Sequence, residues 1–338
     1  MSAAPVPDPV AAYAAALERY VAGGGELDLE AAYALGRQAV AEGTTLLALV
    51  EQHRAAVDLL TRGGTRLGPD TLDATFRFLS EALATFEMAQ RGYWEATEMA
   101  ARERAIALML QHDLLPAAVP PVEGLDVAVR YLPGEATSHA GGDWYDLFRL
   151  DDGRVGLVVG DVTGHGVGAA AAMGQLRIAV LAYALAGFAP GDVVARIDVL
   201  LESLGKGDVA TMVYAIVDAG REELVVANAG HPPPIVVEPG GRPRVVDAGR
   251  GLLLGLDPRL DERATEATAV PAGSHVLFYT DGLIEPLERQ DRDGVGHLVQ
   301  VMDGFTGTAE DLCRHVLAEL TPEQSGDDIC ILVATLAP

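Results

Sequence analysis

The spacing of hydrophobic and polar residues changes near residue 114. Before that point Ala, Leu and Glu dominate, and apolar positions recur with the period of an α-helix. After "LLPAAVPP", residues 114–121, short Val-rich runs alternate with Gly, Asp and Pro, which is typical of strands and turns. The pattern predicts an all-helical N-terminal domain followed by a domain of mixed α+β class.

A seven-residue repeat runs through the last part of the helical region. One seam position holds Leu79, Phe86, Tyr93, Ala100, Ala107 and Leu114, and the other holds Ala82, Ala89, Ala96, Glu103 and Leu110. Five heptads on one helix, ended by Pro116, predict a coiled coil. An amphipathic helix packed on its own domain is the alternative, because the seam is rich in Ala and is broken by Glu103. The predicted domains are therefore 1–78, a linker helix over 79–115, and 116–338.

The C-terminal part alternates between short strands and a few helices. Strands are predicted at 126–131, 144–150, 155–159, 212–217, 223–227, 235–237, 275–279 and 329–334, and helices at 168–186, 191–204 and 309–320. Most connections between strands are too short for parallel crossovers. We therefore expect antiparallel sheets with helices packed outside them.

Composition narrows the choice of partners and compartment. The 338 residues carry a formal net charge of −25, so the chain has no general electrostatic attraction for nucleic acid or anionic lipid. Cys313 and Cys330 are expected to be reduced core thiols, the N-terminus lacks a secretory signal, and we predict a cytoplasmic protein. The apolar stretch 167–187 contains Gln175 and Arg177 and is predicted to be a buried helix rather than a membrane span.

Two carboxylates lie at the open end of one predicted hairpin. The stretch "GGDWYDLFRLDDGRVGLVVGDVTGHG", residues 141–166, reads as two antiparallel strands. A three-residue loop at 151–153 places Asp143 opposite Asp161, whereas a two-residue loop places it opposite Val162, whose carbonyl is then within reach. Facing carboxylates repel unless a cation joins them. The hairpin suggests a metal site, with solvated or turn-capping acids as the alternative.

Two further strand ends carry acids and strengthen the metal hypothesis. In "HVLFYTDGLIEP" an apolar strand stops at Asp281, and in "QSGDDICILVATL" Asp327 and Asp328 directly precede a buried strand. Oxygen ligands without a nearby His and Cys cluster favour Mg²⁺ or Mn²⁺. The Gly-rich loop before the helix at 168–186 also leaves free amide groups that favour an anion such as phosphate.

The motifs "GGDWYD", "GDVTGHG", "NAGHPPP", "FYTDGLIEP" and "GDDICILV", in this order, resemble those of the metal-dependent PPM serine/threonine phosphatases, in the bacterial branch typified by SpoIIE and RsbU. The resemblance covers about residues 114–337 and implies an αββα sandwich. Upstream, "LGRQAVAEGTTLLALVEQH", residues 35–53, is similar to the RsbU-type N-terminal domain. That similarity implies a homodimer and an activating switch-kinase-like partner that docks on the N-terminal domain.

The resemblance also implies roles for individual residues. The carboxylates of Asp143, Asp161, Asp281 and Asp327 and the backbone carbonyl of Val162 would bind two divalent cations, Mn²⁺ or Mg²⁺, and the four carboxylates form the catalytic site. Neighbouring candidates, which would support these ligands or the substrate, are Asp146, Thr163, His165, Gly282 and Asp328. His165 is equally compatible with a structural role, and His231 is interpreted as fixing its loop.

The chain departs from the family pattern at two positions. Many eukaryotic members hold the substrate phosphate with an Arg shortly before the first acidic motif, whereas "ATSHAGGD" offers only His139. Cys330 stands where many bacterial relatives have Thr, and we expect little effect on metal binding.

The implied function is hydrolysis of a phosphoserine on an anti-anti-sigma protein of the STAS class, within a partner-switching stress response. Two alternatives are a catalytically degenerate signalling scaffold, which the four carboxylates disfavour, and a hydrolase of small phosphoesters.

Overall fold

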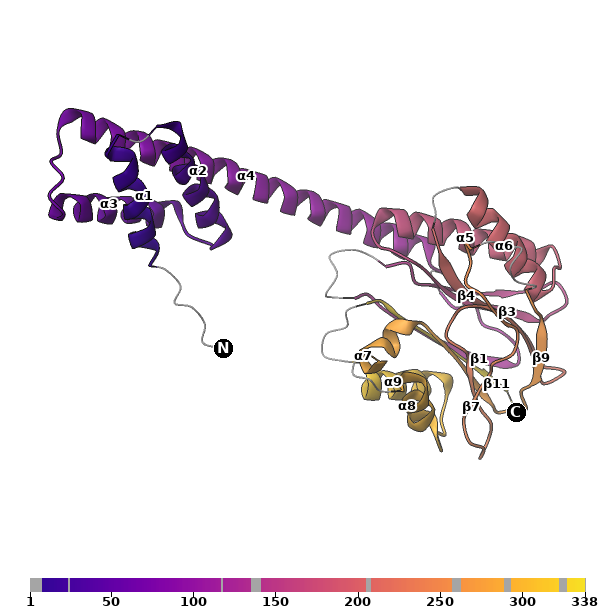
Figure 1. Ribbon diagram of the computed structural model, residues 1–338. Coiled ribbons are helices and arrows are strands. Elements are labelled where there is room, and N and C mark those ends of the chain that lie inside the picture. The colour runs from indigo at the N-terminus through magenta and orange to yellow at the C-terminus, as the bar shows by residue number, and fades with distance from the viewer. Residues whose placement is uncertain are drawn as a thin grey trace. The chain divides into compact units, whose positions relative to one another are not determined.

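The computed structural model describes residues 8–23, 25–116, 118–134, 141–204, 208–256, 263–288, 293–321 and 327–337. It forms two compact units, which divide at Ala100 within one long helix (Figure 1).

The N-terminal unit is a group of helices around one apolar core. They are α1 (Pro9–Val21), α2 (Glu26–Ala41), α3 (Leu46–Arg62) and the first part of α4 (Pro69–Leu114). Asp8 and Thr45 cap α1 and α3 by accepting backbone N–H groups. Tyr13, Leu17 and Phe78 are fully buried between the helices. The predicted all-helical N-terminal part is confirmed.

Helix α4 is a single 46-residue helix that ends two residues before Pro116. It contains residues 79–114 of the predicted 79–115 linker helix without interruption. The heptad seam is buried at Phe86 and Ala82 against the other helices of the N-terminal unit, whereas Tyr93 is 66% exposed. The coiled coil remains a prediction.

The C-terminal unit contains two sheets. One has the order β1-β11-β10-β6-β7, and the other has the order β2-β3-β4-β5-β8, with β9 also paired to β5. The strands are β1 (Leu125–Leu132), β2 (Trp144–Arg149), β3 (Val155–Val162), β4 (Ala210–Asp218), β5 (Glu223–Ala229), β6 (Ile235–Val237), β7 (Arg244–Val245), β8 (Arg250–Gly251), β9 (Glu266–Ala269), β10 (His275–Tyr279) and β11 (Ile329–Leu336). Every pair is antiparallel except β5 with β8.

Helices cover the outer face of each sheet, as Figure 1 shows. Helices α5 (Val167–Leu185) and α6 (Pro190–Leu204) pack on the sheet of β2 to β5, and α8 (Gly294–Met302) and α9 (Ala309–Leu320) pack on the other. A 3₁₀ turn, η1 (Asp281–Leu283), and a short helix, α7 (Glu285–Glu288), follow β10. The unit is an αββα sandwich, which confirms the predicted fold class.

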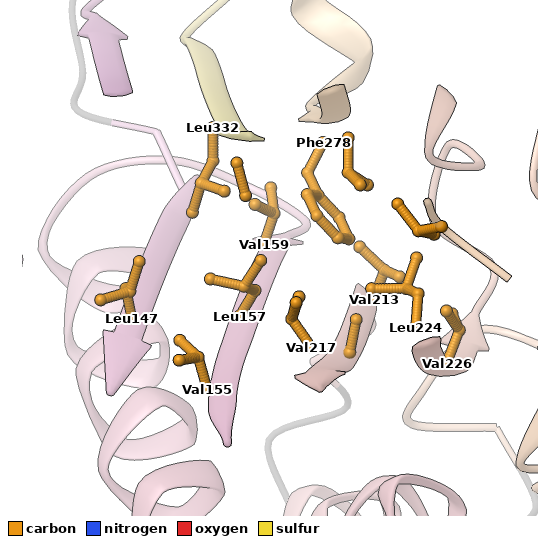
Figure 2. Packing of buried hydrophobic residues seen from close by; sticks show 14 of the residues in the cluster. Leu147, Val155, Leu157, Val159, Val213, Val217, Leu224, Val226, Phe278 and Leu332 are labelled. Atoms are coloured by element: carbon orange, nitrogen blue, oxygen red, sulfur yellow. The ribbon is translucent and has the colours of Figure 1, made fainter. Parts of the chain in front are cut away.

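The space between the two sheets is filled by aliphatic side chains from alternate strand positions. Leu147 and Leu157 from one sheet meet Phe278 and Leu332 from the other (Figure 2). Because side chains alternate along a strand, the intervening residues Trp144 and Phe148 face the helix layer instead. The sandwich therefore has three apolar layers, one between the sheets and one under each helix pair.

All eight predicted strands and all three predicted helices are present within two or three residues of their expected ends. The short strands β7, β8 and β9, the 3₁₀ turn η1 and the helices α7 and α8 were not predicted. Strands of two to four residues carry too little alternation to be recognised, and α8 contains two glycines, which have low helix propensity. Cys313 and Cys330 are both free and buried, as expected.

Within the described residues, α5 is the one helix long and apolar enough to cross a membrane. Its Met173, Leu176 and Val180 are fully buried against the sheet. It packs as a core helix of the sandwich, as its sequence predicted.

Candidate metal centre

The β2–β3 hairpin has the three-residue loop that aligns its two aspartates. The N–H of Leu150 donates to the Arg154 carbonyl at 2.8 Å, and Gly153 adopts a φ of +87°. The last ladder pair is Trp144 with Gly160. One step further along this register, Asp143 lies opposite Asp161. The longer of the two loop alternatives is confirmed, and Asp143 is not opposite Val162.

Asp143, which is buried, and Asp161, which is half-buried, interact through their charges. Asp143 is 3% exposed, and Asp161 is the nearest of the acids that act on it. Burial, and then the neighbouring negative charge of Asp161, raise the pKa of Asp143 well above its usual value. Burial and the charges of Asp281 and Asp327 raise the pKa of Asp161 in the same way. Two carboxylates in this setting are stable as anions only beside a positive charge.

The second pair comes from the other sheet. Asp281 opens the η1 turn directly after β10, and Asp327 lies just before β11, the strand that pairs with β10. Burial, and then the charge of Asp327, raise the pKa of Asp281. Asp281 also interacts electrostatically with both Asp143 and Asp161. The four predicted carboxylates therefore occupy one region, contributed as one pair from each sheet.

The donor chemistry of this region fits divalent cations. Oδ2 of Asp143 is buried and lacks a hydrogen-bond partner among the described residues, so a buried carboxylate oxygen is left for an ion to satisfy. In the part of the chain that the structure describes, no three His, Cys, Asp or Glu side chains are grouped closely enough to enclose an ion alone. Backbone oxygens or water would therefore have to complete the coordination of hard cations at these carboxylates.

Two glycines allow the backbone segments that carry these acids to approach closely. A Cβ on Gly142 would lie 2.0 Å from the Val162 carbonyl oxygen, and the Val162 N–H donates to the Gly142 carbonyl at 3.2 Å. A Cβ on Gly282 would lie 2.0 Å from the Asp328 carbonyl oxygen. Because Gly142 has no side chain, the segment just before β2 can lie against the Val162 carbonyl. Because Gly282 has none, η1 can lie against the start of β11.

Asp328 is the centre of a buried hydrogen-bonded group, which we call the Asp328 cluster: Asp328, Gln111, Tyr131, Gly134 and Gly141. Oδ1 accepts the Gly134 N–H at 2.8 Å, and Oδ2 accepts the Gly141 N–H at 3.2 Å and the amide of Gln111 at 2.8 Å. The Tyr131 hydroxyl also donates to Oδ2. Asp328 thus directly follows the ligand candidate Asp327, and its carboxylate holds the backbone at Gly134 and Gly141.

Three other predicted candidates lie apart from the acidic pairs. Asp146 faces the helix layer and forms a buried ion pair with Arg177 of α5 at 2.5 Å. The Thr163 hydroxyl donates to the Val209 carbonyl at 2.9 Å, which joins the end of β3 to the segment before β4. His165 is exposed in the loop before α5. Residues 143 and 146 point to opposite faces of the strand, and a supporting role of Asp146 at the metal site stays a prediction. His139 lies outside the described residues.

His231 fixes its loop, as predicted, and its ring also links the two sheets. Its ring contacts the Thr211 hydroxyl through Nδ1 at 2.9 Å and the Tyr279 carbonyl through Nε2 at 3.1 Å. Its backbone N–H and carbonyl both bond to the Asn228 side chain. Thr211 is the ladder partner of Asp161, and Tyr279 lies two residues before Asp281. The imidazole therefore joins the two sheets next to the acidic pairs.

Gln111, Tyr131 and Thr280 belong to the site region and were not predicted. The Thr280 hydroxyl accepts the Cys330 N–H at 2.8 Å, and its side chain opposes the rise in the pKa of Asp143. The sequence did not single out Gln111, because His112 and Asp113 beside it are also polar. The contacts of Tyr131 and Thr280 depend on strand pairing, which has no local signature.

Two packed sheets, each covered by helices on its outer face, are the architecture of the PP2C-type protein serine/threonine phosphatases. The PP2C domain of the cell fate determinant SpoIIE from Bacillus subtilis shares this fold with a TM-score of 0.55 at 17% identity, covering 64% of each chain. Residues 151–337 match the family of stage II sporulation protein E (SpoIIE), and residues 11–89 match the N-terminal domain of the phosphoserine phosphatase RsbU. The chain belongs to the SpoIIE family and carries an RsbU-type N-terminal domain.

Relatives and solved structures agree with this assignment. The phosphoserine phosphatase RsbU of Bacillus subtilis (strain 168) is 23% identical over 94% of both chains, and RsbP of the same organism is 28% identical over 45% of this chain. The structure of the RsbU and RsbW domains of Rv1364c from Mycobacterium tuberculosis is 33% identical, with a TM-score of 0.58 over 65% of this chain. This chain spans 38% of the length of RsbP and 64% of that of the Rv1364c structure.

Proposed function

We propose that the protein is a metal-dependent phosphatase that removes phosphate from a phosphoserine on a STAS-class anti-anti-sigma protein. The observation that carries the proposal is the meeting of two aspartate pairs, one from each sheet, with a buried and unsatisfied carboxylate oxygen on Asp143. The names of RsbU and RsbP, which are phosphoserine phosphatases, support the same reaction.

Asp143, Asp161, Asp281 and Asp327, with the Val162 carbonyl, would hold the cations. When bound, Mn²⁺ or Mg²⁺ supplies neutralisation of phosphoryl charge and activation of water. A solved structure with this fold, that of RsbX, contains magnesium. The protein contributes the carboxylates at fixed positions. Burial raises the pKa of Asp143, so a bound cation would be needed to keep this carboxylate ionised.

The reaction is tested by measuring phosphate release from a phosphorylated STAS protein with and without Mn²⁺. Asp143→Asn and Asp281→Asn should each reduce the rate by at least about 100-fold, because each removes a charged ligand. Asp151→Asn, in the exposed turn of the same hairpin, is the matched control and should retain activity.

The outcomes separate the alternatives. Activity retained in both site variants would refute the site assignment. Binding of Mn²⁺ without any hydrolysis would favour a signalling scaffold, and preference for para-nitrophenyl phosphate over the phosphoprotein would favour a hydrolase of small phosphoesters.

We further propose that the protein is a cytoplasmic homodimer activated by a switch-kinase-like partner on its N-terminal unit. Large apolar side chains are exposed on α4 within this unit: Met88, Tyr93, Trp94 and Met99 are each at least 66% exposed. Such a surface favours association. Light scattering of the full chain should give a dimer mass, and Tyr93→Glu should shift it toward the monomer. A monomer at all concentrations would contradict the dimer.

A further inference from the structure

The ring of His231 lies between two strands that belong to different sheets. The residue is 4% exposed, its Nδ1 lies 2.9 Å from the Thr211 hydroxyl, and its Nε2 lies 3.1 Å from the Tyr279 carbonyl. Because a carbonyl only accepts hydrogen bonds, Nε2 carries the proton and Nδ1 accepts from Thr211. One neutral ring therefore spans the interior from β4 of one sheet to β10 of the other.

The Tyr279 carbonyl needs this donor, because the neighbouring strand cannot supply one. β10 pairs with β6, with Leu277 opposite Ile235. Two residues further along this register Tyr279 lies opposite Pro233, and proline has no N–H group to donate. The sequence "HPPP", residues 231–234, thus ends the ladder within one sheet and replaces its next hydrogen bond by one from the loop that crosses between the sheets.

The backbone of this loop is held by contacts that do not involve the ring. The Asn228 side chain accepts the His231 N–H at 2.8 Å and donates to the His231 carbonyl at 3.0 Å. Gly230 has a φ of +67°, and a Cβ at this position would lie 2.9 Å from the Leu253 side chain. Replacing the ring should therefore remove the link between the sheets and leave the course of the loop unchanged.

Each end of the link lies next to a predicted metal ligand. Thr211 is the ladder partner of Asp161 on β3. Tyr279 is the last residue of β10, and Asp281 follows two residues later at the start of η1. The position of Asp161 relative to Asp281 therefore depends on the distance that the ring fixes between β4 and β10.

Electrostatic repulsion acts against this link in the absence of metal. The charges of Asp281 and Asp327, from one sheet, act on Asp161 of the other. Like charges in a buried site repel until a cation joins them. Without a tie between the sheets, the strand ends would relax apart, and a cation would have to bring them together again at the expense of its own binding free energy.

We infer that His231 is a positioning residue, whose ring holds the two sheets at the separation at which their aspartates bind divalent cations. The inference rests on the proposed function, since it assigns a role at the same site. It predicts that losing this ring lowers metal affinity more than losing an equally buried histidine elsewhere in the sandwich.

His275 is the matched control. It is 6% exposed, lies at the other end of β10, and its Nδ1 is 2.7 Å from the Thr335 hydroxyl. Thr335 is its ladder partner in β11, so this contact joins two strands of one sheet. His275→Leu should therefore lower the unfolding free energy without changing the separation of the sheets beside the aspartates.

Calorimetric titration of the folded full chain with Mn²⁺, without substrate, tests the inference. His231→Leu should raise the dissociation constant about 10-fold, as for other residues that orient metal ligands. Thr211→Val, which removes the hydroxyl and keeps the Tyr279 bond, should raise it less, and the double variant should show less than the sum of the two effects. His231→Gln, which still donates to the Tyr279 carbonyl, should recover part of the affinity. His275→Leu should stay within about twofold of wild type.

Phosphate release gives a second readout. The Mn²⁺ concentration for half-maximal release should rise in the same order of variants. The KM for the phosphoprotein at saturating Mn²⁺ should stay within about twofold, because the ring acts on the metal ligands and does not contact the substrate.

The possible failures are distinct. If wild-type protein binds Mn²⁺ but releases no phosphate, the proposed function is wrong, and the titration still decides the role of His231. If wild type binds no Mn²⁺, both are wrong. If His231→Leu and Thr211→Val bind Mn²⁺ as wild type does, or if His275→Leu loses as much affinity as His231→Leu, the positioning role is wrong. If His231→Leu does not fold, Thr211→Val and His231→Gln decide the question.

Discussion

His231→Leu should destabilise the sandwich, because the imidazole links its two sheets. The Tyr279 carbonyl can only accept a hydrogen bond, so Nε2 carries the proton and Nδ1 accepts from the Thr211 hydroxyl. Leucine has a similar volume and removes both bonds. The backbone bonds to the Asn228 side chain are retained, so the loop itself should keep its course.

The expected loss of unfolding free energy is about 2–4 kcal/mol. A buried acceptor left without a donor costs about 1–3 kcal/mol, and Thr211, which is partly exposed, adds less because water can reach it. His231→Gln can still donate to the Tyr279 carbonyl and should lose about half as much. Urea unfolding followed by circular dichroism and by the fluorescence of the buried Trp144 measures both values.

His231 should also make the unfolding free energy depend on pH, and the pKa of its ring gives the sign of that dependence. Burial lowers the pKa of His231 from its ordinary 6.5 to about 3, so the folded protein holds the neutral ring. The stabilisation is fully present above pH 6.5 and is lost as the pH falls from 6.5 toward 3. The stability gap between wild type and His231→Leu should therefore shrink by up to about 2 kcal/mol between about pH 7 and pH 5. A gap below about 0.5 kcal/mol at neutral pH, or one that does not change with pH, would refute the reasoning.

Three further predictions concern other parts of the chain. Gly282→Ala should abolish Mn²⁺-dependent phosphate release in a folded protein, because its Cβ would meet the Asp328 carbonyl oxygen at 2.0 Å; wild-type rates would contradict this. Asp198→Asn should lower the unfolding free energy by about 3 kcal/mol in urea, because it weakens a buried ion pair with Arg263 that is 4% exposed or less; a loss below about 1 kcal/mol would count against it. Burial lowers the pKa of His53 from 6.5 to about 4, so the N-terminal unit should lose stability as the pH falls through this range, and His53→Gln should remove that part of the pH dependence of its melting temperature.

Local features could be read from the sequence because their causes are local. The 151–153 turn, with its glycine at positive φ, sets the register of the β2–β3 hairpin, and the register brings Asp143 to Asp161. The helical period and Pro116 similarly predicted one helix through residue 114. The same alternation places Asp146 on the opposite face from Asp143, where it pairs with Arg177.

Contacts between distant segments could not be read in this way. β1 pairs with β11, and β10 pairs with both β11 and β6, in a register that no local pattern specifies. These pairings bring Asp281 and Asp327 together and place them opposite the hairpin pair. Gln111, Tyr131 and His231 became part of the site region only through such contacts.

The sequence by itself determined most helices, most strands and the identity of the acidic residues, and it reduced the hairpin register to two choices, because turn geometry and side-chain periodicity act over a few residues. The tertiary structure alone decided how the two acidic pairs face each other and which buried donors hold Asp328. That second set depends on packing two sheets and a helix end into one interior, where each buried polar group must find a partner from whatever segment lies beside it.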